Sequence, residues 1–317
     1  MFILAFSKLL FKSGLKSANI GINEMRRKKV TKAVIAAAGY GTRFLPATKN
    51  IPKELIPVIN MPTIQFAVDE CVASGITDII IVTRYGNSSL EDYFDSSPEL
   101  ERSLRESGKD ELAERIRQIY TAANIVFVRQ TTSLPYGNGS PLLAAKHLID
   151  NDEAFIYLYG DDVIFGPPAC KELIDKYKED GASAVLGVAE VDLKTVTPGA
   201  LIKLRAGTKD RVEKIVEKPP IDKAPSNLFS FGRYLFKYRI FDYLDPKKTG
   251  KGNELWTADA IDRLAKEWKV VVQPISGKWF TTGDPLHYLE VIFEYSYRNP
   301  ELKAKLLELI SHYSNIG

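Results

Sequence analysis

The sequence predicts an α/β protein with a mostly parallel central sheet. Short apolar runs rich in Val, Ile and Ala alternate with amphipathic segments as far as residue 190. The runs are apolar almost throughout, as expected for strands that are covered on both faces. After Gly199 the segments between the runs lose their helical character, which indicates a β-rich extension packed on the same sheet.

Each element follows from its local pattern. In the first helix, Ile64, Ala67, Val68 and Cys71 keep the helical period, and Gly75 ends it. The segment 98–120 is highly charged and predicts a solvated helix or a pair of helices. The other predicted helices cover 141–148, 169–177, a face formed by Ile261, Leu264, Ala265 and Trp268, and 285–297; the predicted strands cover 33–38, 79–83, 125–130, 154–160, 183–190, 200–205, 212–219 and 228–236.

We expect a poorly ordered tail over residues 1–30, one domain over 31–298 and a C-terminal helix over 299–317. Lysines interrupt the apolar residues of the tail, and no clear small-residue cleavage site follows, so a signal peptide is the less favoured interpretation. Met25 is an alternative translation start. No run approaches the roughly 18 uninterrupted apolar residues of a transmembrane helix, so no membrane span is expected.

Composition excludes several classes of protein. Among 317 residues, 43 basic and 40 acidic side chains give a net charge of +3, which does not indicate a nucleic-acid binder. The two cysteines, Cys71 and Cys170, form no CxxC pair. We therefore expect buried thiols in a reducing compartment, the cytoplasm, and no disulfide framework or zinc site.

The loop after the first strand carries the most informative motif, IAAAGYGTRFLPATKNIPKELIP over residues 35–57. In open α/β sheets, ligands bind at the carboxyl ends of strands. Gly39 and Gly41 would let backbone amides approach phosphate oxygens, and Arg43 and Lys53 would supply positive charge. A plain turn with exposed charges is the alternative. The loop lacks the third glycine of a dinucleotide fingerprint and the GK[ST] of a P-loop.

The longer pattern GxGTRxLPxTKxxPKE, from Gly39 to Glu54, resembles the sugar-1-phosphate nucleotidyltransferases, in the form found in prokaryotic UTP–glucose-1-phosphate uridylyltransferases. The similarity extends over residues 31–298. Further matching segments are NMPTIQFAVDECVASGITDIIIVT at 60–83, VRQ at 128–130, YGDDVI at 159–164, VEKP at 216–219, APSNL…GRY at 224–234 and NELWTADAIDRL at 253–264.

The resemblance implies a Rossmann-like three-layer nucleotidyltransferase fold with a β-rich sugar-binding extension. It implies transfer of a uridylyl group from UTP to glucose 1-phosphate, with Mg²⁺ as cofactor and UDP-glucose and pyrophosphate as products. A homo-oligomer, dimer or tetramer, is expected, without nucleic-acid or membrane partners. Thymidylyl transfer or dual use of UTP and dTTP is an alternative, because uracil and thymine differ by one methyl group. A second alternative is a non-catalytic regulatory homologue that binds nucleotide sugar.

The resemblance also assigns roles to individual residues. It implies that Gln130 recognises uracil and that Glu217 binds sugar hydroxyls. It also implies that Asp161 is the metal ligand and that Asp162 supports it. Neighbours on a regular strand point to opposite faces, so Glu217 and Lys218 can share a ligand only if the backbone is irregular there. The expected catalytic residues are Arg43, Lys53, Asp161 and Lys218; the expected nucleotide-binding residues are Ala38, Gly39, Gly41, Thr42, Glu54, Gln130 and Gly137; the expected sugar-binding residues are Gly199, Glu217 and Lys218.

The chain departs from the family pattern at three places. Gly137 is followed by Asn138 where the family has Gly-His, and Gly199 stands in TPGA instead of after a tyrosine. The family also commonly has an aspartate two positions before the glycine that corresponds to Gly283, and this chain has Thr281 there. Asp284 next to that glycine, or Thr281 acting through water, is expected to complete the metal site. If neither does, the regulatory alternative gains weight.

Overall fold

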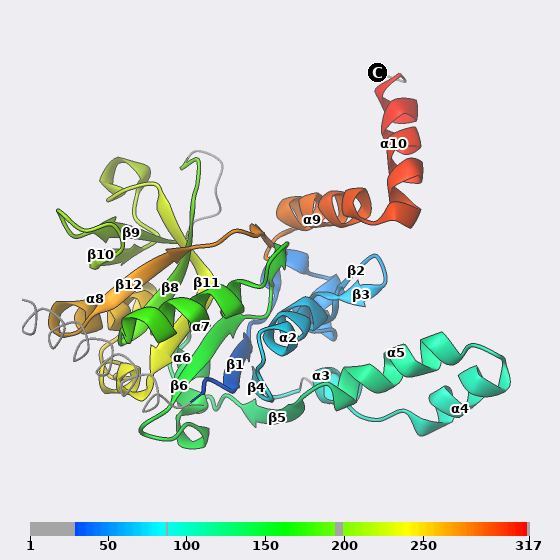
Figure 1. Ribbon diagram of the computed structural model, residues 1–317, viewed down its shortest axis with the longest axis horizontal. Coiled ribbons are helices and arrows are strands. Elements are labelled where there is room, and N and C mark those ends of the chain that lie inside the picture. The colour runs from blue at the N-terminus through cyan, green and yellow to red at the C-terminus, as the bar shows by residue number, and fades with distance from the viewer. Residues whose placement is uncertain (1–28, 87, 194–198, 316–317) are drawn as a thin grey trace, which may run out of the picture.

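A computed structural model describes residues 29–86, 88–193 and 199–315 (Figure 1). The main sheet contains β1 (Lys32–Ala37), β4 (Asp78–Thr83), β5 (Asn124–Arg129), β6 (Ala154–Tyr159), β8 (Ala184–Glu190), β9 (Ala200–Leu204), β10 (Val212–Glu217), β11 (Leu228–Lys237) and β12 (Val270–Pro274). Its order is β10-β9-β11-β6-β1-β4-β5, and β8 pairs with both β11 and β12.

The sheet has a parallel part and an antiparallel part. β6, β1, β4 and β5 pair in parallel. β11 then pairs antiparallel with β6, β8 and β9, and β9 pairs antiparallel with β10. The predicted α/β class is confirmed. The β-rich extension that begins near Gly199 supplies the antiparallel strands β9, β10 and β11, whereas its last strand, β12, pairs in parallel with β8.

Helices cover both faces of the sheet, because successive residues of each buried strand point to opposite sides. On β1, Val34 faces one core with α6 (Gly139–Ala144) and α8 (Thr257–Glu267). Its neighbour Ile35 faces the other core with α2 (Thr63–Ala73) and α7 (Ala169–Asp180). The three layers that result hold the carboxyl ends of β1 and β6 together at one edge.

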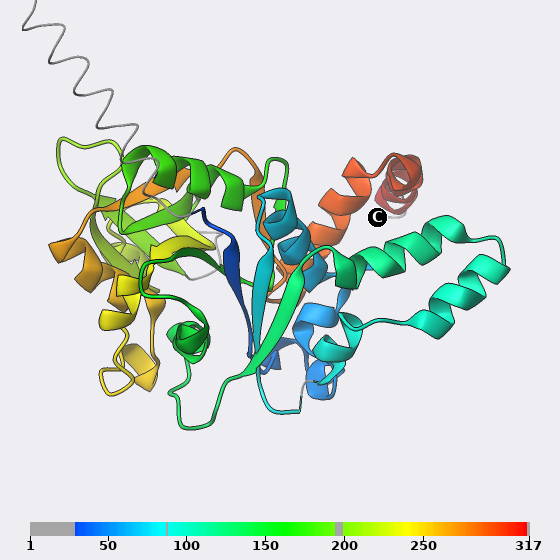
Figure 2. The same cartoon turned by 60° about the horizontal axis from the view of Figure 1, so that its bottom comes forward.

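A helical hairpin extends from the sheet beyond α3 (Ser88–Tyr93), as Figures 1 and 2 show. It consists of α4 (Pro98–Glu106) and α5 (Asp110–Thr121). Gly108, with φ 70°, reverses the chain between the two helices. Of the two forms predicted for 98–120, the pair of helices is therefore the one observed.

The chain ends in two helices, α9 (Pro285–Arg298) and α10 (Pro300–Ser314). Asn299 between them has an extended backbone, and its side chain accepts from the Glu301 amide at 2.9 Å. Pro300 cannot donate a backbone hydrogen bond to α9, so a new helix starts in a new direction. In Figure 1, α10 turns away from α9 and from the sheet.

The structure contains several short strands that the sequence did not predict. They are β2 (Pro57–Val58), β3 (Met61–Pro62), β7 (Asp162–Phe165) and β13 (Lys278–Thr281), and the longer β12 is also new. Two to four residues are too few to show a hydrophobic period. The predicted helical face that ended at Trp268 stops earlier, because α8 ends at Glu267 and Trp268 is exposed with an extended backbone.

Cys71 and Cys170 are free and buried, which confirms the expectation for both thiols. Residues 1–28 of the predicted tail lie outside the described residues, whereas Val30 is buried in the core that contains Ile35. No helix in the described ranges combines the length and the apolar character needed to cross a membrane.

Candidate active site

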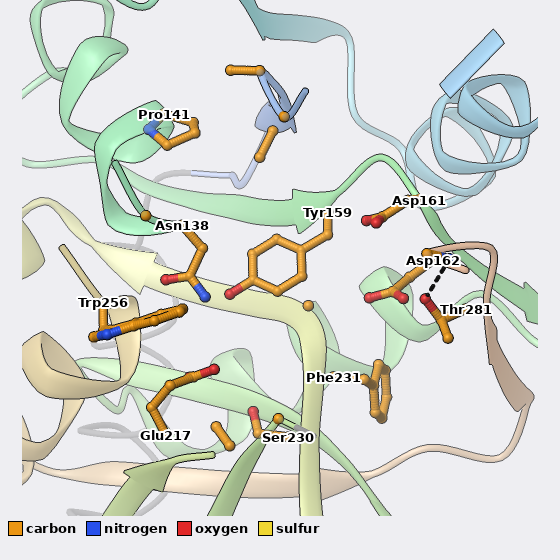
Figure 3. A pocket seen from close by; sticks show the side chains of 18 of the residues that line it. Asn138, Pro141, Tyr159, Asp161, Asp162, Glu217, Ser230, Phe231, Trp256 and Thr281 are labelled. Atoms are coloured by element: carbon orange, nitrogen blue, oxygen red, sulfur yellow. Dashed lines mark hydrogen bonds between the residues drawn. The ribbon is translucent and has the colours of Figure 1, made fainter. Parts of the chain in front are cut away.

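A pocket of about 290 Å³ opens at the carboxyl ends of β1 and β6. Eleven of the residues expected to act in the site line it: Ala38, Gly39, Arg43, Lys53, Glu54, Gln130, Gly137, Asp161, Gly199, Glu217 and Lys218. Figure 3 looks into this pocket. Trp256 and Glu217 lie on one side of Tyr159, and Asp161, Asp162 and Thr281 lie on the other. The two groups define a Glu217 end and an Asp161 end.

The glycine loop after β1 folds back on itself through short 3-10 turns. Gly41 has φ 62°, and its carbonyl accepts from the Thr48 hydroxyl at 2.7 Å. A Cβ on Gly41 would lie 3.1–3.2 Å from atoms of Thr48 and Lys53, so a larger residue would disturb both the backbone and the packing. The side chain of Arg43 donates to the Gly283 carbonyl at 3.0 Å. This bond ties the loop to the segment after β13.

Lys53 and Asp161 form an ion pair at the Asp161 end, with 2.5 Å between Nζ and a carboxylate oxygen. Burial alone would raise the pKa of Asp161, but the Lys53 ammonium outweighs it and holds that pKa below its usual value. Burial opposes the charge on Lys53, and Asp161 with Glu54 nonetheless raises its pKa. Both groups are therefore charged at neutral pH.

Asp162 follows Asp161 and starts β7. The pairing of β7 with β13 sets Thr281 opposite Asp162, and the two side chains lie next to each other in the pocket (Figure 3). A hydrogen bond with the Thr281 side chain favours the charged form of Asp162, and the Thr281 hydroxyl also accepts from the Gly283 amide at 3.1 Å. Burial first, and then the charge on Asp161, raises the pKa of Asp162 to about 7. The threonine that replaces the family aspartate is thus in direct contact with a second carboxyl group.

Glu217 and Lys218 both line the pocket because the strand ends between them. β10 stops at Glu217, and Lys218 has φ 42°, which breaks the alternation of a regular strand. The Lys218 amide donates to the Gly199 carbonyl at 3.0 Å, and its ammonium lies 4.3 Å from the centre of the Trp256 ring. Burial is the main reason that the pKa of Glu217 rises to about 7.

Gly137 and Gln130 line a further part of the pocket. Gly137 has φ 128°, and a Cβ there would lie 2.5 Å from the Leu255 carbonyl oxygen. The buried side-chain oxygen of Gln130 has no hydrogen-bond partner among the described residues. Tyr136, which also lines the pocket, stacks on Tyr40 with 6.4 Å between ring centroids. A flat aromatic surface and an unused amide oxygen together are suited to a planar polar ligand.

A sequence model of the nucleotidyl transferase family matches residues 32–297. The chain belongs to the nucleotidyl transferase family. It is 40% identical to a UTP–glucose-1-phosphate uridylyltransferase of Bacillus subtilis (strain 168) over 291 residues, which are 91% of this chain and 98% of the relative.

Two solved structures share the nucleotidyl transferase fold of this chain. One is UDP-glucose pyrophosphorylase complexed with UDP-glucose, with 33% identity, a TM-score of 0.74 and coverage of 85% of this chain and 100% of that one. The other is a UTP-bound UGPase from Acinetobacter baumannii, with 33% identity, a TM-score of 0.78 and coverage of 89% and 98%.

Gly41, Thr42 and Asp284 are not among the pocket-lining residues of this nucleotidyl transferase. Asp284 caps α9: its carboxylate accepts from the amides of Leu286 at 3.1 Å and His287 at 3.2 Å, and it pairs with the His287 ring at 2.7 Å. These hydrogen bonds hold its pKa low despite partial burial. Both carboxylate oxygens of Asp284 already accept hydrogen bonds from the first turn of α9. The role of Asp284 as a metal ligand stays a prediction.

Other residues of the pocket were not expected from the sequence. Trp256 belongs to the matched NELW segment, so the sequence carried a signal for it. Asn138, which departs from the Gly-His of the family, accepts a hydrogen bond from the Thr257 amide through its side-chain oxygen at 2.8 Å and joins the pocket to the start of α8. Tyr159, Phe229 and Phe231 read as ordinary apolar strand residues, and only the fold turns them toward the pocket.

Proposed function

We propose that this chain transfers a uridylyl group from UTP to glucose 1-phosphate and forms UDP-glucose and pyrophosphate. The observation that carries the proposal is one pocket with a cation at each end, Lys53 beside Asp161 and Lys218 beside Glu217. Two separated cations suit a reaction between two phosphorylated substrates. The printed names of the relative and of the two ligand-bound structures support the same reaction.

In the proposed reaction, a phosphate oxygen of glucose 1-phosphate attacks the α-phosphorus of UTP. The new P–O bond forms as the bond to the bridging oxygen of the β-phosphate breaks, and pyrophosphate leaves with that electron pair. Arg43 and Lys53 face the triphosphate, and Lys218 faces the phosphate of the acceptor. Both substrates are anionic, so these cations reduce their repulsion, and the fixed loop aligns them.

The residues of the Asp161 end fit a magnesium ion. Asp161 and Asp162 are consecutive and line the same pocket, and carboxylate oxygens are the ligands that Mg²⁺ prefers. No group of three or more potential ligands occurs among the described residues. Mg²⁺ commonly uses one or two carboxylates, with water and substrate phosphates completing the shell. We propose Asp161 as its main ligand; a bound Mg²⁺ would neutralise charge on the phosphates.

The remaining subsites follow from the two ends. We propose that Gln130 hydrogen-bonds the uracil edge, because its amide oxygen is buried without a partner in the described part of the chain. We propose that Glu217 hydrogen-bonds sugar hydroxyls next to the phosphate held by Lys218. Glu54 lies beside Lys53 with one unpartnered buried oxygen, which is suited to a hydroxyl of the nucleotide.

A pyrophosphate-release assay tests the proposed reaction. Glucose 1-phosphate and Mg²⁺ are held constant while UTP, dTTP, CTP, ATP and GTP are supplied in turn. We expect turnover with UTP. Turnover with dTTP alone would assign the chain to thymidylyl transfer, and comparable rates with both would make it a dual enzyme. Inactivity with every nucleotide, together with measurable binding of UDP-glucose, would replace the enzyme by a regulatory binding protein.

We further propose that the chain forms a homo-oligomer through α9 and α10. A groove of about 550 Å³ lies between these helices and β13, and Leu289, Phe293 and Ile310 line it while partly exposed. Such a patch commonly marks an interface. Lys278 in the lining already pairs with Glu294 at 3.0 Å, so a second copy related by a two-fold axis would meet a mainly apolar surface whose cation is neutralised within the chain.

Sedimentation velocity tests the homo-oligomer. The unmodified chain should sediment as a dimer or larger, and Phe293→Asp should shift it toward the monomer. Leu112→Asp is the control, because Leu112 is similarly exposed on α5, away from the groove. A monomeric unmodified chain, or equal effects of the two substitutions, would contradict this interface.

We also propose a cytoplasmic location. Two buried cysteines that remain free support a reducing compartment. Fractionation of cells that express the chain at its native level would test this. Recovery in an extracellular or membrane fraction would contradict it.

A further inference from the structure

We propose that Arg233 is a positioning residue that fixes the turn carrying Asp161. We define the Asp161 turn as residues 159–162, which connect β6 to β7. Arg233 is fully buried, with 0% exposure, and does not line the pocket. The inference rests on the proposed function only in taking Asp161 as the metal ligand. Arg233 has no role in the proposed transfer step itself.

The guanidinium of Arg233 holds the Asp161 turn from both sides. One terminal nitrogen donates to the Tyr159 carbonyl at 3.2 Å and to the Gly232 carbonyl at 3.0 Å. The other donates to the Asp162 carbonyl at 2.8 Å. The Asp161 carbonyl itself accepts from the amide and the hydroxyl of Thr282, at 2.7 and 3.0 Å. Carbonyls before, at and after the Asp161 carboxylate are therefore all fixed by side-chain or loop donors.

A counter-ion keeps Arg233 charged in this position. Its Nε donates to Glu70 at 2.9 Å, and the other oxygen of Glu70 accepts from the Cys170 amide at 3.0 Å, in the first turn of α7. Burial opposes the charge on Arg233, but Glu70 outweighs it and raises the pKa of Arg233. The ion pair of Arg233 and Glu70 therefore links α2, α7 and β11 to the Asp161 turn. Burying the Arg233 cation removes its hydration, and the pairing with Glu70 offsets that loss.

The backbone of β11 is shaped to place this side chain. Its pairing with β8 shifts register between Ser230 and Tyr234, so extra residues of β11 bulge there. Gly232 lies in the bulge, where a Cβ would lie 2.1 Å from the Tyr159 ring. The absent side chain lets β11 approach the end of β6, and Arg233 then reaches the carbonyls beyond Tyr159.

The substitution Arg233→Lys distinguishes the contribution of the positive charge from that of the guanidinium hydrogen bonds. It would keep a positive charge for Glu70, but a single ammonium cannot reproduce the planar fork that contacts both carbonyls. We therefore expect Arg233→Lys to fold and to loosen the Asp161 turn. A displacement of about 1 Å at a reacting group can cost about 100-fold in rate, so kcat should fall by about that factor. The KM for glucose 1-phosphate should change little.

Two measurements do not depend on turnover. Binding of Mn²⁺ in the presence of UTP, followed by electron paramagnetic resonance against a blank of Mn²⁺ and UTP without protein, reports the metal site proposed at Asp161. Amide hydrogen exchange of the peptide that contains residues 159–163 reports the turn. For Arg233→Lys we expect at least about tenfold weaker Mn²⁺ binding, since one rearranged ligand contact typically costs about 10–100-fold, and faster exchange in that peptide.

Leu235→Ala is the matched control. Leu235 is also fully buried, lies two positions further on β11 and points into the same core as Arg233. Its truncation should lower thermal stability while leaving Mn²⁺ binding and kcat near those of the unmodified chain. Glu70→Gln is the second test variant, because an amide of the same shape retains one contact while removing the counter-charge. We expect it to weaken Mn²⁺ binding in the same direction as Arg233→Lys.

The outcomes separate positioning from general stability. Equal Mn²⁺ binding and equal exchange in Arg233→Lys and Leu235→Ala would overturn the proposal. If Arg233→Lys does not fold, Glu70→Gln decides in the same way against Leu235→Ala. If the unmodified chain has no transferase activity with any nucleotide, the proposed reaction fails, while the Mn²⁺ and exchange results still decide the role of Arg233.

Discussion

The Lys53 ammonium and the Asp161 carboxylate lie 2.5 Å apart and neutralise each other in the pocket. Both side chains are about one-fifth exposed. The ammonium of Lys53 has three N–H donors and Asp161 takes one of them, so Lys53 can hold Asp161 and a phosphate oxygen at the same time. The pair thus couples the cation expected to bind the triphosphate to the carboxylate expected to bind Mg²⁺.

We predict that Lys53→Ala lowers kcat/KM by about 100-fold or more, because removal of one preorganised charged contact commonly costs that much in the transition state. Steady-state pyrophosphate release with UTP and glucose 1-phosphate measures the loss. Lys49→Ala is the control, since Lys49 belongs to the same loop but is exposed and does not line the pocket. Near-normal rates in Lys53→Ala would remove Lys53 from the catalytic residues.

Lys218→Ala should raise the KM for glucose 1-phosphate much more than the KM for UTP. Its ammonium sits over Trp256 at the Glu217 end, away from Asp161. Trp256→Leu should act in the same direction but more weakly, because a cation–π contact contributes about 0.5–2 kcal/mol. Lys214→Ala, at an exposed position on β10, is the control. Equal increases in the two KM values would show that Lys218 does not belong to the subsite of the sugar phosphate.

The sequence predicted the Glu217 end well because its signals are local. The strand predicted over 212–219 ends two residues earlier, at Glu217, and Lys218 has a positive φ, which is the irregular backbone that two neighbours need in order to share a ligand. The two neighbours can therefore face one pocket. A run such as AVIAAA likewise predicts a buried strand without knowledge of its neighbours, and β1 begins and ends within one residue of the predicted bounds.

The Asp161 end could not be predicted in the same way. Thr281 and Asp162 meet only because two four-residue strands, β7 and β13, pair across more than a hundred residues of sequence. No period is visible in segments so short. Arg233 belongs to the GRY segment that matches the family, but its burial depends on a counter-ion in α2 and on carbonyls of a distant turn. Such long-range pairings follow from the assembled sheet.

The free energy of unfolding should depend on pH through Glu54, and Glu54→Gln should remove that dependence. Glu54 is 1% exposed, and burial, opposed by Lys53 and reinforced by Asp161, raises its pKa from 4.5 to about 7. The folded state therefore binds more protons than the unfolded state between these values, so the contribution of Glu54 to stability is present below pH 4.5 and is lost as pH rises to about 7.

Denaturant unfolding in EDTA, from pH 4.5 to 7, measures this effect. The stability of Glu54→Gln relative to the unmodified chain should increase by roughly 3 kcal/mol over that window. Glu106→Gln, which changes an exposed carboxylate at the end of α4, should show no such trend. A constant difference for Glu54→Gln across the window would mean that Glu54 is ionised throughout.

Substitutions of Asp161 and Asp284 should have opposite consequences for the dependence of activity on Mg²⁺. Asp161→Asn should abolish turnover at ordinary Mg²⁺, because Asp161 lines the pocket and is the expected main ligand. Asp284→Asn should leave the Mg²⁺ requirement unchanged, since Asp284 caps α9 and asparagine is an equally good cap. Asp284→Ala should cost about 0.5–2 kcal/mol of stability through loss of that cap.

Activity titrated against Mg²⁺, with thermal unfolding of the same variants, distinguishes the two roles of Asp284. A helix cap affects unfolding and not the Mg²⁺ titration. A metal ligand does the reverse: Asp284→Asn would then lose most activity and recover part of it at high Mg²⁺. That recovery would make Asp284 the substitute for the aspartate that Thr281 replaces. Without it, one carboxylate with water and substrate phosphates is sufficient, as the coordination preferences of Mg²⁺ allow.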